Sequence, residues 1–362
     1  MNRLKTVRLI CAGAIYAFLV FFYALSAPTD GHDDSGLARL KRPPAWSDEA
    51  LSYRWAIKTP ALYRWVDYGA LALCGASNAG AALAVVRCVN AVWLVGALAC
   101  IVLLARGATG SWGWGLVVAA PLALSGRFGA GVGGSVSPDA AFTFFLALMA
   151  LVWVRHDLSG NAAAWPRVLT VGVLGGLALS TRYGAALVLV AYAAHLVGSR
   201  RVAGLSRAAV FAATVAAVFA AINPVMWRGG PVWWADVWRD VIELRAGELQ
   251  LQTDDIRGFA VQLSAAFPAW YAAPVLAWLF WRARRARWFV PLALWAGCLA
   301  FGAALTAYDV SDRNIVPLEM PLIVLVMLSA VSLYLGERGS GILTIRVKRR
   351  AEAIAVSNEK TA

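Results

Sequence analysis

Residues 80–104 read GAALAVVRCVNAVWLVGALACIVLL, a run of apolar side chains that contains a single charged residue, Arg87. A helix needs about 20 consecutive apolar residues to cross the hydrocarbon core of a bilayer, because each residue advances the helix by about 1.5 Å. Residues 80–104 meet that length. The stretch therefore predicts a transmembrane helix, in which we expect Arg87 to pair or to extend toward the interface.

Similar apolar stretches recur along the whole chain. Those that we interpret as transmembrane helices are 9–27, 80–104, 113–130, 139–154, 167–181, 184–198, 208–224, 259–281, 288–307 and 315–335. The composition agrees, since 60% of the 362 residues are hydrophobic and only 15% are charged, against about 25% charged in soluble domains. We therefore expect an all-α polytopic membrane protein with about ten transmembrane helices, and a shorter interfacial helix over Ala61–Leu73.

The distribution of charge supports this interpretation and orients the chain. If the N-terminus is cytoplasmic and the helices alternate, the inside segments hold 19 Lys and Arg residues with 4 acids, and the outside segments hold 13 with 16 acids. Basic residues concentrate on cytoplasmic loops of membrane proteins. The formal charge of +13 is thus a topology signal rather than a sign of nucleic-acid binding, and both termini are expected in the cytoplasm, at a bacterial inner membrane.

The ends of the chain have different characters. Arg3, Lys5 and Arg8 precede an apolar run that is long for a signal peptide, so we expect a retained first helix over 9–27 rather than a cleaved leader. After Leu335 the sequence turns polar and basic. We expect one transmembrane unit over 1–336 and a basic cytoplasmic tail over 337–362.

Two segments predicted to lie outside are longer than connectors need to be. They cover 28–60 and 223–258, and the second contains apolar residues at helical spacing over 232–244, which predicts an amphipathic helix on the outer leaflet. His32 beside Asp33 and Asp34 in the first loop admits a metal site, but a solvated acidic surface is the simpler interpretation.

Cysteine and histidine give little indication of a metal or redox site. The five cysteines show no C-x-x-C spacing and the three histidines show no metal-binding spacing. We predict buried thiols, no metal site and no cofactor.

Charged side chains at the predicted outer ends of the helices are the candidates for chemistry, because charge at membrane depth is costly. They are Asp48, Glu49, Lys58, Arg64, Arg127, Asp139, Arg182, Asp309, Asp312 and Arg313. Fixed cations can neutralise a phosphate, and a carboxylate can take a proton from an attacking hydroxyl. A cavity at the outer interface that is lined by such acids and cations would suit a substrate that is both lipid and phosphate.

Local patterns refine this hypothesis. In chain order they are WSDEALSYRWAIKTPALYRW at 46–65, SVSPDAAFTFFLALMAL at 135–151, LALSTRYGAALVLV at 177–190, NPVMWRGGP at 223–231 and SDRNIVPLEMPLIVL at 311–325. Together they resemble the GT-C glycosyltransferase superfamily, especially the branch of protein O-mannosyltransferases and lipid A aminoarabinose transferases. That branch carries an Asp-Glu pair, a Lys-Pro-Pro-Leu-Tyr-like segment, an Asp that opens a helix, a cation between two helices and a late Arg-Tyr motif.

The resemblance implies a role for each matching residue. Asp48 would be the general base on the acceptor hydroxyl, and Glu49 would orient the acceptor or hold the loop. Lys58, Arg182 and Arg313 would bind a polyprenyl phosphate, with Arg64 and Arg127 as further substrate-binding candidates, and Asp139 would bond the sugar or brace a cation.

Each residue also has a plainer interpretation. Asp48 and Glu49 could be a solvated pair, Lys58 and Arg64 could extend to the interface, and Asp139 could favour a helix start through the helix dipole. The sequence departs from the family where Thr59-Pro60 replaces Pro-Pro and Arg313-Asn314 replaces Arg-Tyr. These departures leave the donor and the acceptor open.

The resemblance implies an inverting glycosyltransferase that moves a sugar from a polyprenyl phosphate to a hydroxyl of a lipid, glycan or protein at the extracytoplasmic face. Two alternatives remain. A lipid or sugar transporter would more often show repeated halves, and a non-catalytic membrane partner in polysaccharide assembly would tolerate changes at Asp48 and Lys58.

Overall fold

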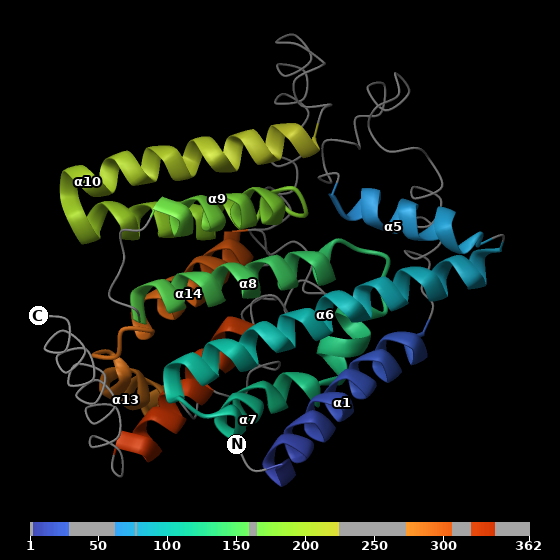
Figure 1. The fold of residues 1–362 in the computed structure, drawn as a ribbon, viewed down its shortest axis with the longest axis horizontal. Coiled ribbons are helices and arrows are strands. Elements are labelled where there is room, and N and C mark those ends of the chain that lie inside the picture. Colours follow the sequence, from blue (N-terminus) through green and yellow to red (C-terminus); the bar gives the residue numbers. More distant parts are fainter. Residues whose placement is uncertain are drawn as a thin grey trace, which may run out of the picture.

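The computed structural model describes residues 3–28, 62–76, 78–158, 165–223, 273–305 and 320–336. The described residues are helical and contain no strand, which agrees with the all-α prediction (Figure 1). The helices are α1 Arg3–Ser26, α5 Leu62–Cys74, α6 Ala79–Thr109, α7 Trp112–Ala123, η1 Arg127–Val132, α8 Asp139–Leu158, α9 Trp165–Leu179, α10 Ala185–Ile222, α13 Ala273–Ala283, α14 Phe289–Leu305 and a C-terminal helix Met320–Gly336.

Helix α6, which contains the stretch 80–104, runs longer than predicted because both of its ends are capped. The Asn78 side chain accepts a hydrogen bond from the Ala81 amide at 2.8 Å at the start of the helix. At its end Gly110 adopts a left-handed conformation, with φ at 73°, and donates its amide to the Arg106 carbonyl at 2.7 Å. A 31-residue helix is longer than a bilayer requires.

Among the described residues, three helical stretches are long and apolar enough to cross a membrane: Thr6–Ser26, Ala79–Thr109 and Ala203–Ile222. Shorter apolar helices are Trp112–Ala123, Trp165–Leu179, Ala185–Gly198, Phe289–Cys298 and Met320–Gly336. The chain is an integral membrane protein, but the count of about ten transmembrane helices stays a prediction.

The predicted continuous helix over 113–130 is wrong in detail. The structure divides it into α7, which ends at Ala123, and the π-helical turn η1. Pro121 near the end of α7 has no amide hydrogen to donate. Gly129 in η1 then lies so close to α1 that a Cβ would come within 2.5 Å of the Tyr23 Cβ. The π-helical turn η1 is thus the part of this region that packs closely against α1.

Helix α10 folds back on itself. A Cβ on Gly204 would overlap the Leu196 carbonyl oxygen and lie 2.9 Å from the Val197 Cα. Residues eight positions apart in a straight helix are about 12 Å apart, so the helix axis reverses between these residues. The two arms, Ala185–Gly198 and Ala203–Ile222, correspond to the predicted helices over 184–198 and 208–224.

The helices pack in adjacent layers around one apolar core. Figure 1 shows α9 and α10 together, α8 and α6 beside them, and α7 and α1 beyond α6, with α14 against α8 and α10. Trp153, Tyr192 and Phe211 form a buried aromatic column, with ring centroids 5.0 Å apart for Trp153 and Tyr192 and 4.9 Å apart for Tyr192 and Phe211.

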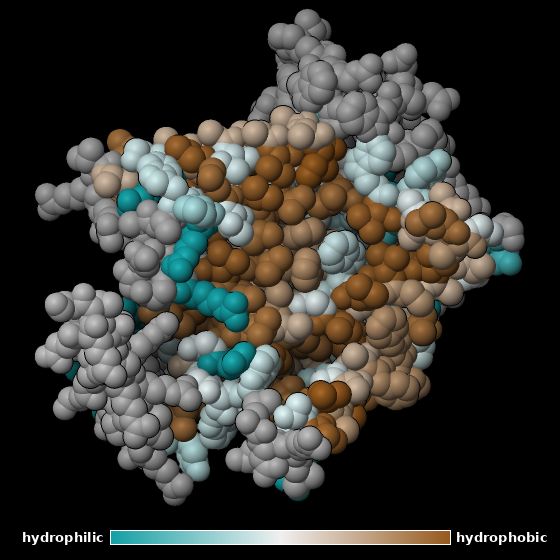
Figure 2. Space-filling view, viewed as in Figure 1, coloured by the Kyte–Doolittle hydropathy of each residue, from teal (hydrophilic) through white to brown (hydrophobic). Residues whose placement is uncertain are grey.

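The visible surface is mainly apolar. In Figure 2 apolar side chains cover most of the face over these layers, and hydrophilic side chains gather on the left of the view, where α10 turns and α13 lies. A broad apolar surface is the pattern expected of helices that face lipid.

Helix α5 lies where the sequence predicts an interfacial helix. Tyr63, Asp67 and Leu71 follow one another at helical spacing on one side of α5, and Tyr63 and Leu71 pack there with Leu83 and Val86 of α6. The opposite side is exposed, and Leu73 is 90% accessible. At 13 residues, α5 is too short to cross a bilayer.

Candidate functional site

Asp139 and Arg182 form an ion pair at one end of the helix bundle. Asp139 is the first residue of α8, and Arg182 lies in the turn between α9 and α10. The Asp139 side chain is only 3% exposed, whereas that of Arg182 is 36% exposed. The acid is thus enclosed in protein, while the cation reaches the surface.

The same turn is connected to two other segments through Ser180. The Ser180 carbonyl accepts the Leu62 amide hydrogen at 3.0 Å, which attaches the start of α5. The Ser180 hydroxyl accepts a hydrogen bond from the Asn223 side-chain amide at 3.0 Å, and the same amide donates to the Phe219 carbonyl at 2.8 Å. Ser180 and Asn223 are both buried, so these bonds are shielded from water.

Arg87 holds a third group of segments together. Its Nε donates to the Gly134 carbonyl at 2.8 Å, and its terminal nitrogens donate to the Ala27 carbonyl at 2.7 Å and the Pro28 carbonyl at 3.0 Å. The side chain is 5% exposed. A planar guanidinium offers five donors in a fixed fork, which suits it to hold the end of α1 against the chain that leads to α8.

Asn90, one turn further along α6, completes this support. Its side-chain amide donates to the Ser135 carbonyl at 2.8 Å. The Ser137 hydroxyl lies 3.0 Å from that of Ser135 and accepts the Asp139 amide hydrogen at 3.4 Å. The segment before α8 is therefore fixed by side chains from α6, and its position determines where Asp139 lies.

We call this end of the bundle the polar end and define it by Arg87, Asp139, Ser180, Arg182 and Asn223. The opposite end is the basic end, which includes Arg106, Arg155, Arg282, Arg284 and Arg285. Two contacts show that the helix ends carrying these arginines lie together. Gly107 near the end of α6 lies close to Leu158 at the end of α8, and the rings of Trp114 on α7 and Tyr334 on the C-terminal helix have centroids 5.4 Å apart.

The structure describes four of the predicted site residues. It brings Asp139 and Arg182 together. Arg64 is half-buried on α5, two residues after Leu62, which is bound to the Ser180 turn. Arg127 is exposed at the first residue of η1, which packs against α1. The predicted residues Asp48, Glu49, Lys58 and Arg313 lie outside the described residues, as do the predicted helix over 232–244 and the tail over 337–362.

Two polar residues that organise the polar end were not expected there from the sequence. Arg87 was predicted to pair or to extend to the interface, and the structure shows it donating to backbone carbonyls. The sequence predicts no role for Asn90, which lies one turn away on the same helix and donates to the Ser135 carbonyl. Two polar residues three positions apart in an otherwise apolar stretch were the available signal, because such groups need internal partners in a membrane.

Helix α5 carries a buried carboxyl group, that of Asp67. Asp67 is 2% exposed, and its Oδ2 has no hydrogen-bond partner within the described residues. Burial raises the pKa of the Asp67 carboxyl to about 8. The group is therefore mostly protonated at neutral pH.

In the part of the chain that the structure describes, no three His, Cys, Asp or Glu side chains gather closely enough to hold a metal ion. What the described polar end offers is a cation at the surface, supported by a buried acid. Such a cation can neutralise a phosphate, because the buried acid holds the guanidinium in a fixed position.

The comparisons with known proteins define first a class of fold. The archaeal oligosaccharyltransferase AglB from Archaeoglobus fulgidus, in complex with an inhibitory peptide and a dolichol-phosphate, has a similar fold with a TM-score of 0.52 over 95% of this chain, at 14% identity. A second structure of the Archaeoglobus fulgidus oligosaccharyltransferase, in complex with zinc and sulfate, gives a TM-score of 0.53 over 96% of this chain, also at 14% identity. The chain corresponds to about half of those proteins, 51% in each case.

A second comparison, with protein families, gives a similarity over part of the sequence. Residues 58–227 match the family of dolichyl-phosphate-mannose-protein mannosyltransferases. A search of curated proteins found no match. The family match and the shared fold confirm the resemblance to the GT-C superfamily of membrane glycosyltransferases.

Proposed function

We propose that this protein transfers a sugar from a polyprenyl-phosphate donor to a hydroxyl acceptor. The observation that carries the proposal is that the family match over 58–227 contains the polar end, including the Arg182 cation supported by buried Asp139. The structural neighbour AglB is in complex with a dolichol-phosphate, which is consistent with a lipid phosphate as the donor's leaving group. The acceptor is a lipid, a glycan or a protein.

The reaction requires a base and a stabilised leaving group. The acceptor oxygen attacks the anomeric carbon while the bond from that carbon to the phosphate oxygen breaks, which inverts the configuration. The hydroxyl proton passes to the Asp48 carboxylate, and the polyprenyl phosphate leaves with the bonding electrons. Lys58, Arg64, Arg182 and Arg313 neutralise the phosphate, so the leaving group needs no proton.

Within this mechanism Asp139 is a positioning residue. It lies against Arg182 and is buried, so it holds the guanidinium in one orientation while the exposed part of that group faces the substrate. Glu49 orients the acceptor. Arg127, exposed at the start of η1, is a candidate contact to the donor.

The proposed orientation places the polar end at the extracytoplasmic face and the basic end in the cytoplasm, at a bacterial inner membrane. The support is the charge distribution, since Arg282, Arg284, Arg285 and Arg287 lie in and beside one short turn and basic residues concentrate on the cytoplasmic side.

Sugar transfer in membranes tests the proposal. Membranes that contain wild type, Asp48→Asn, Lys58→Ala or Arg182→Gln at matched expression receive a radiolabelled polyprenyl-phosphate sugar, and the label is followed into the acceptor fraction. We expect a loss of about 100-fold or more for Asp48→Asn, since positioned bases contribute about 10²–10⁴-fold, and clear losses for the two cation variants.

Arg155→Gln is the matched control, because Arg155 is an exposed arginine at the opposite end of α8. Its activity should equal that of wild type. Full activity in Asp48→Asn would contradict the assigned base. No transfer by wild type from any polyprenyl-phosphate sugar would contradict the transferase and favour a transporter or a non-catalytic partner.

A further inference from the structure

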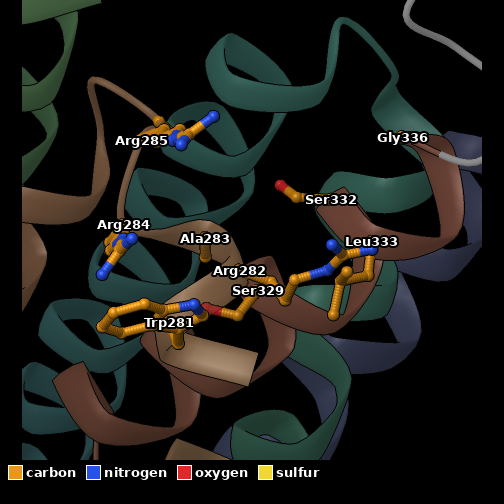
Figure 3. A pocket seen from close by; sticks show the side chains of 10 residues that line it. Trp281, Arg282, Ala283, Arg284, Arg285, Ser329, Ser332, Leu333 and Gly336 are labelled. Atoms are coloured by element: carbon orange, nitrogen blue, oxygen red, sulfur yellow. The ribbon is translucent and has the colours of Figure 1, made fainter. Parts of the chain in front are cut away.

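A cavity of about 450 Å³ lies at the basic end, far from the polar end. It is formed by the end of α13, the turn that follows it and the last turns of the C-terminal helix (Figure 3). Its lining includes Arg282, Arg284, Arg285, Ser329 and Ser332. The cavity combines three cations with two hydroxyls.

The positive charge of the cavity is not balanced by acids in the described part of the chain. Arg282, Arg284 and Arg285 are all exposed, and the ion pair found among the described residues joins Arg182 to Asp139 at the other end. The Arg284 guanidinium lies over the Trp281 ring, 3.1 Å from its centroid. Arg282 lies 6.0 Å from the centroid of Trp278. These contacts orient two of the cations and leave their charge uncompensated.

The side chains converge in a way that suits a tetrahedral anion. Figure 3 shows Arg285 and Ser332 pointing toward one another from the turn and from the C-terminal helix, while Arg282 lies beside Leu333. The Ser329 hydroxyl already donates to the Leu325 carbonyl at 2.7 Å, so it is fixed in place. Guanidinium groups bind phosphate oxygens through two parallel hydrogen bonds.

The surroundings of the cavity are apolar and face outward. Trp278 and Trp281 on α13 are 54% and 62% exposed, and Val275 on the same helix is 57% exposed. Tryptophan is favoured at the boundary between headgroups and acyl chains. A ligand in this cavity would therefore have its charged part among the arginines and an apolar part along α13.

We propose that this cavity binds the phosphodiester headgroup of an anionic phospholipid from the leaflet at the basic end. The arginines hold the phosphate oxygens, Ser332 donates to an ester oxygen or a headgroup hydroxyl, and the acyl chains lie along the exposed side of α13. Basic pockets between transmembrane helices bind such headgroups through the same chemistry. The site is separate from the proposed sugar-transfer site and does not depend on it.

Binding of a tail-labelled fluorescent phosphatidylglycerol to the purified full-length protein in detergent tests the proposal. Unlabelled phosphatidylglycerol, phosphatidylcholine and soluble glycerol phosphate serve as competitors. We expect phosphatidylglycerol to compete well and the other two poorly. For Arg282→Gln/Arg285→Gln we expect an affinity about 30-fold weaker, because each basic residue near an anionic lipid is worth about fivefold.

Two further variants separate a specific cavity from general surface charge. Arg155→Gln/Arg287→Gln removes the same charge from exposed residues at this end that do not line the cavity, and it should keep wild-type affinity. Ser332→Phe leaves the charge unchanged but fills the space, so it should also weaken binding. Thermal unfolding midpoints confirm that each variant is folded.

Three results would overturn the proposal. Equal weakening by the control pair would mean diffuse attraction to the surface, and full affinity in both Arg282→Gln/Arg285→Gln and Ser332→Phe would mean that the lipid binds elsewhere. Glycerol phosphate competing as well as phosphatidylglycerol would assign the cavity to a soluble phosphate instead of a lipid.

Discussion

Asp67 is buried on α5, one turn from Tyr63 and from Leu71, which pack against apolar side chains of α6. Its carboxyl is enclosed and its Oδ2 has no partner within the described residues. A buried carboxylate without a cation is costly, whereas the protonated acid is tolerated. The residue is thus compatible with the fold in its neutral form, and its cost depends on pH.

We predict that the stability of the protein decreases as pH rises from about 4 to about 8 through Asp67. Burial raises the pKa of this carboxyl from 3.8 to about 8, so over this range the unfolded chain has released the proton that the folded protein still binds. Asp67→Asn removes this dependence. Its unfolding midpoint in detergent should exceed that of wild type at pH 8 and approach it at about pH 4, and parallel pH profiles for the two proteins would contradict the prediction.

Among the described helices, α10 is the one whose axis reverses, at Gly204. The Ala203–Ile222 arm can return alongside the first arm because Gly204 has no side chain where the two arms meet. This brings Asn223 back to the Ser180 turn. The hydrogen bond between Asn223 and Ser180 thus depends on a glycine at the other end of the Ala203–Ile222 arm.

We predict that Gly204→Ala destabilises the protein by about 1–3 kcal/mol, the usual cost of forcing an extra methyl group into a packed site. The added Cβ would overlap the Leu196 carbonyl oxygen. Gly198→Ala is the matched control on the same helix, because a Cβ there has no atom within 4 Å. Thermal unfolding in detergent should show a lower midpoint for Gly204→Ala only, and equal midpoints for the two variants would show that the turn accommodates the methyl group.

At the scale of the whole molecule, the polar end and the basic end lie at opposite ends of one helix bundle. Helix α6 connects them, from Asn78 near the polar end to Gly110 near the basic end. Cys74, at the end of α5, is exposed at the polar end, so the prediction of a buried thiol is wrong for this residue. Ser111 follows α6 at the basic end. These two positions therefore report the sides of the membrane.

We predict that Cys74, kept as the single cysteine, reacts in intact cells with a membrane-impermeant maleimide. A Ser111→Cys variant without other cysteines should react only after permeabilisation. The physical reason is that α6 is long and apolar enough to separate the two positions by a bilayer. Labelling of both positions in intact cells would show that α6 does not span, and the reverse pattern would invert the proposed orientation.

Much of this organisation follows from the sequence alone. Apolar runs such as 80–104 predict helices because burial of nonpolar side chains in a membrane depends on composition and length, which are local properties. Helices of the described residues accordingly correspond to predicted apolar stretches, and the motifs between residues 58 and 227 lie in the region that matches the family model. The break between α7 and η1 was not predicted, since it accompanies close packing of Gly129 on α1.

The partners within the polar end were decided only by the tertiary structure. Asp139 and Arg182 are 43 residues apart in the chain, as are Ser180 and Asn223, and Arg87 reaches carbonyls 47 and 60 residues away. The sequence by itself determined that these polar groups lie in or beside apolar helices, where each needs an internal partner. Which partner each one found depended on how the helices pack, because hydrogen bonds form only between groups that the fold brings within about 3 Å.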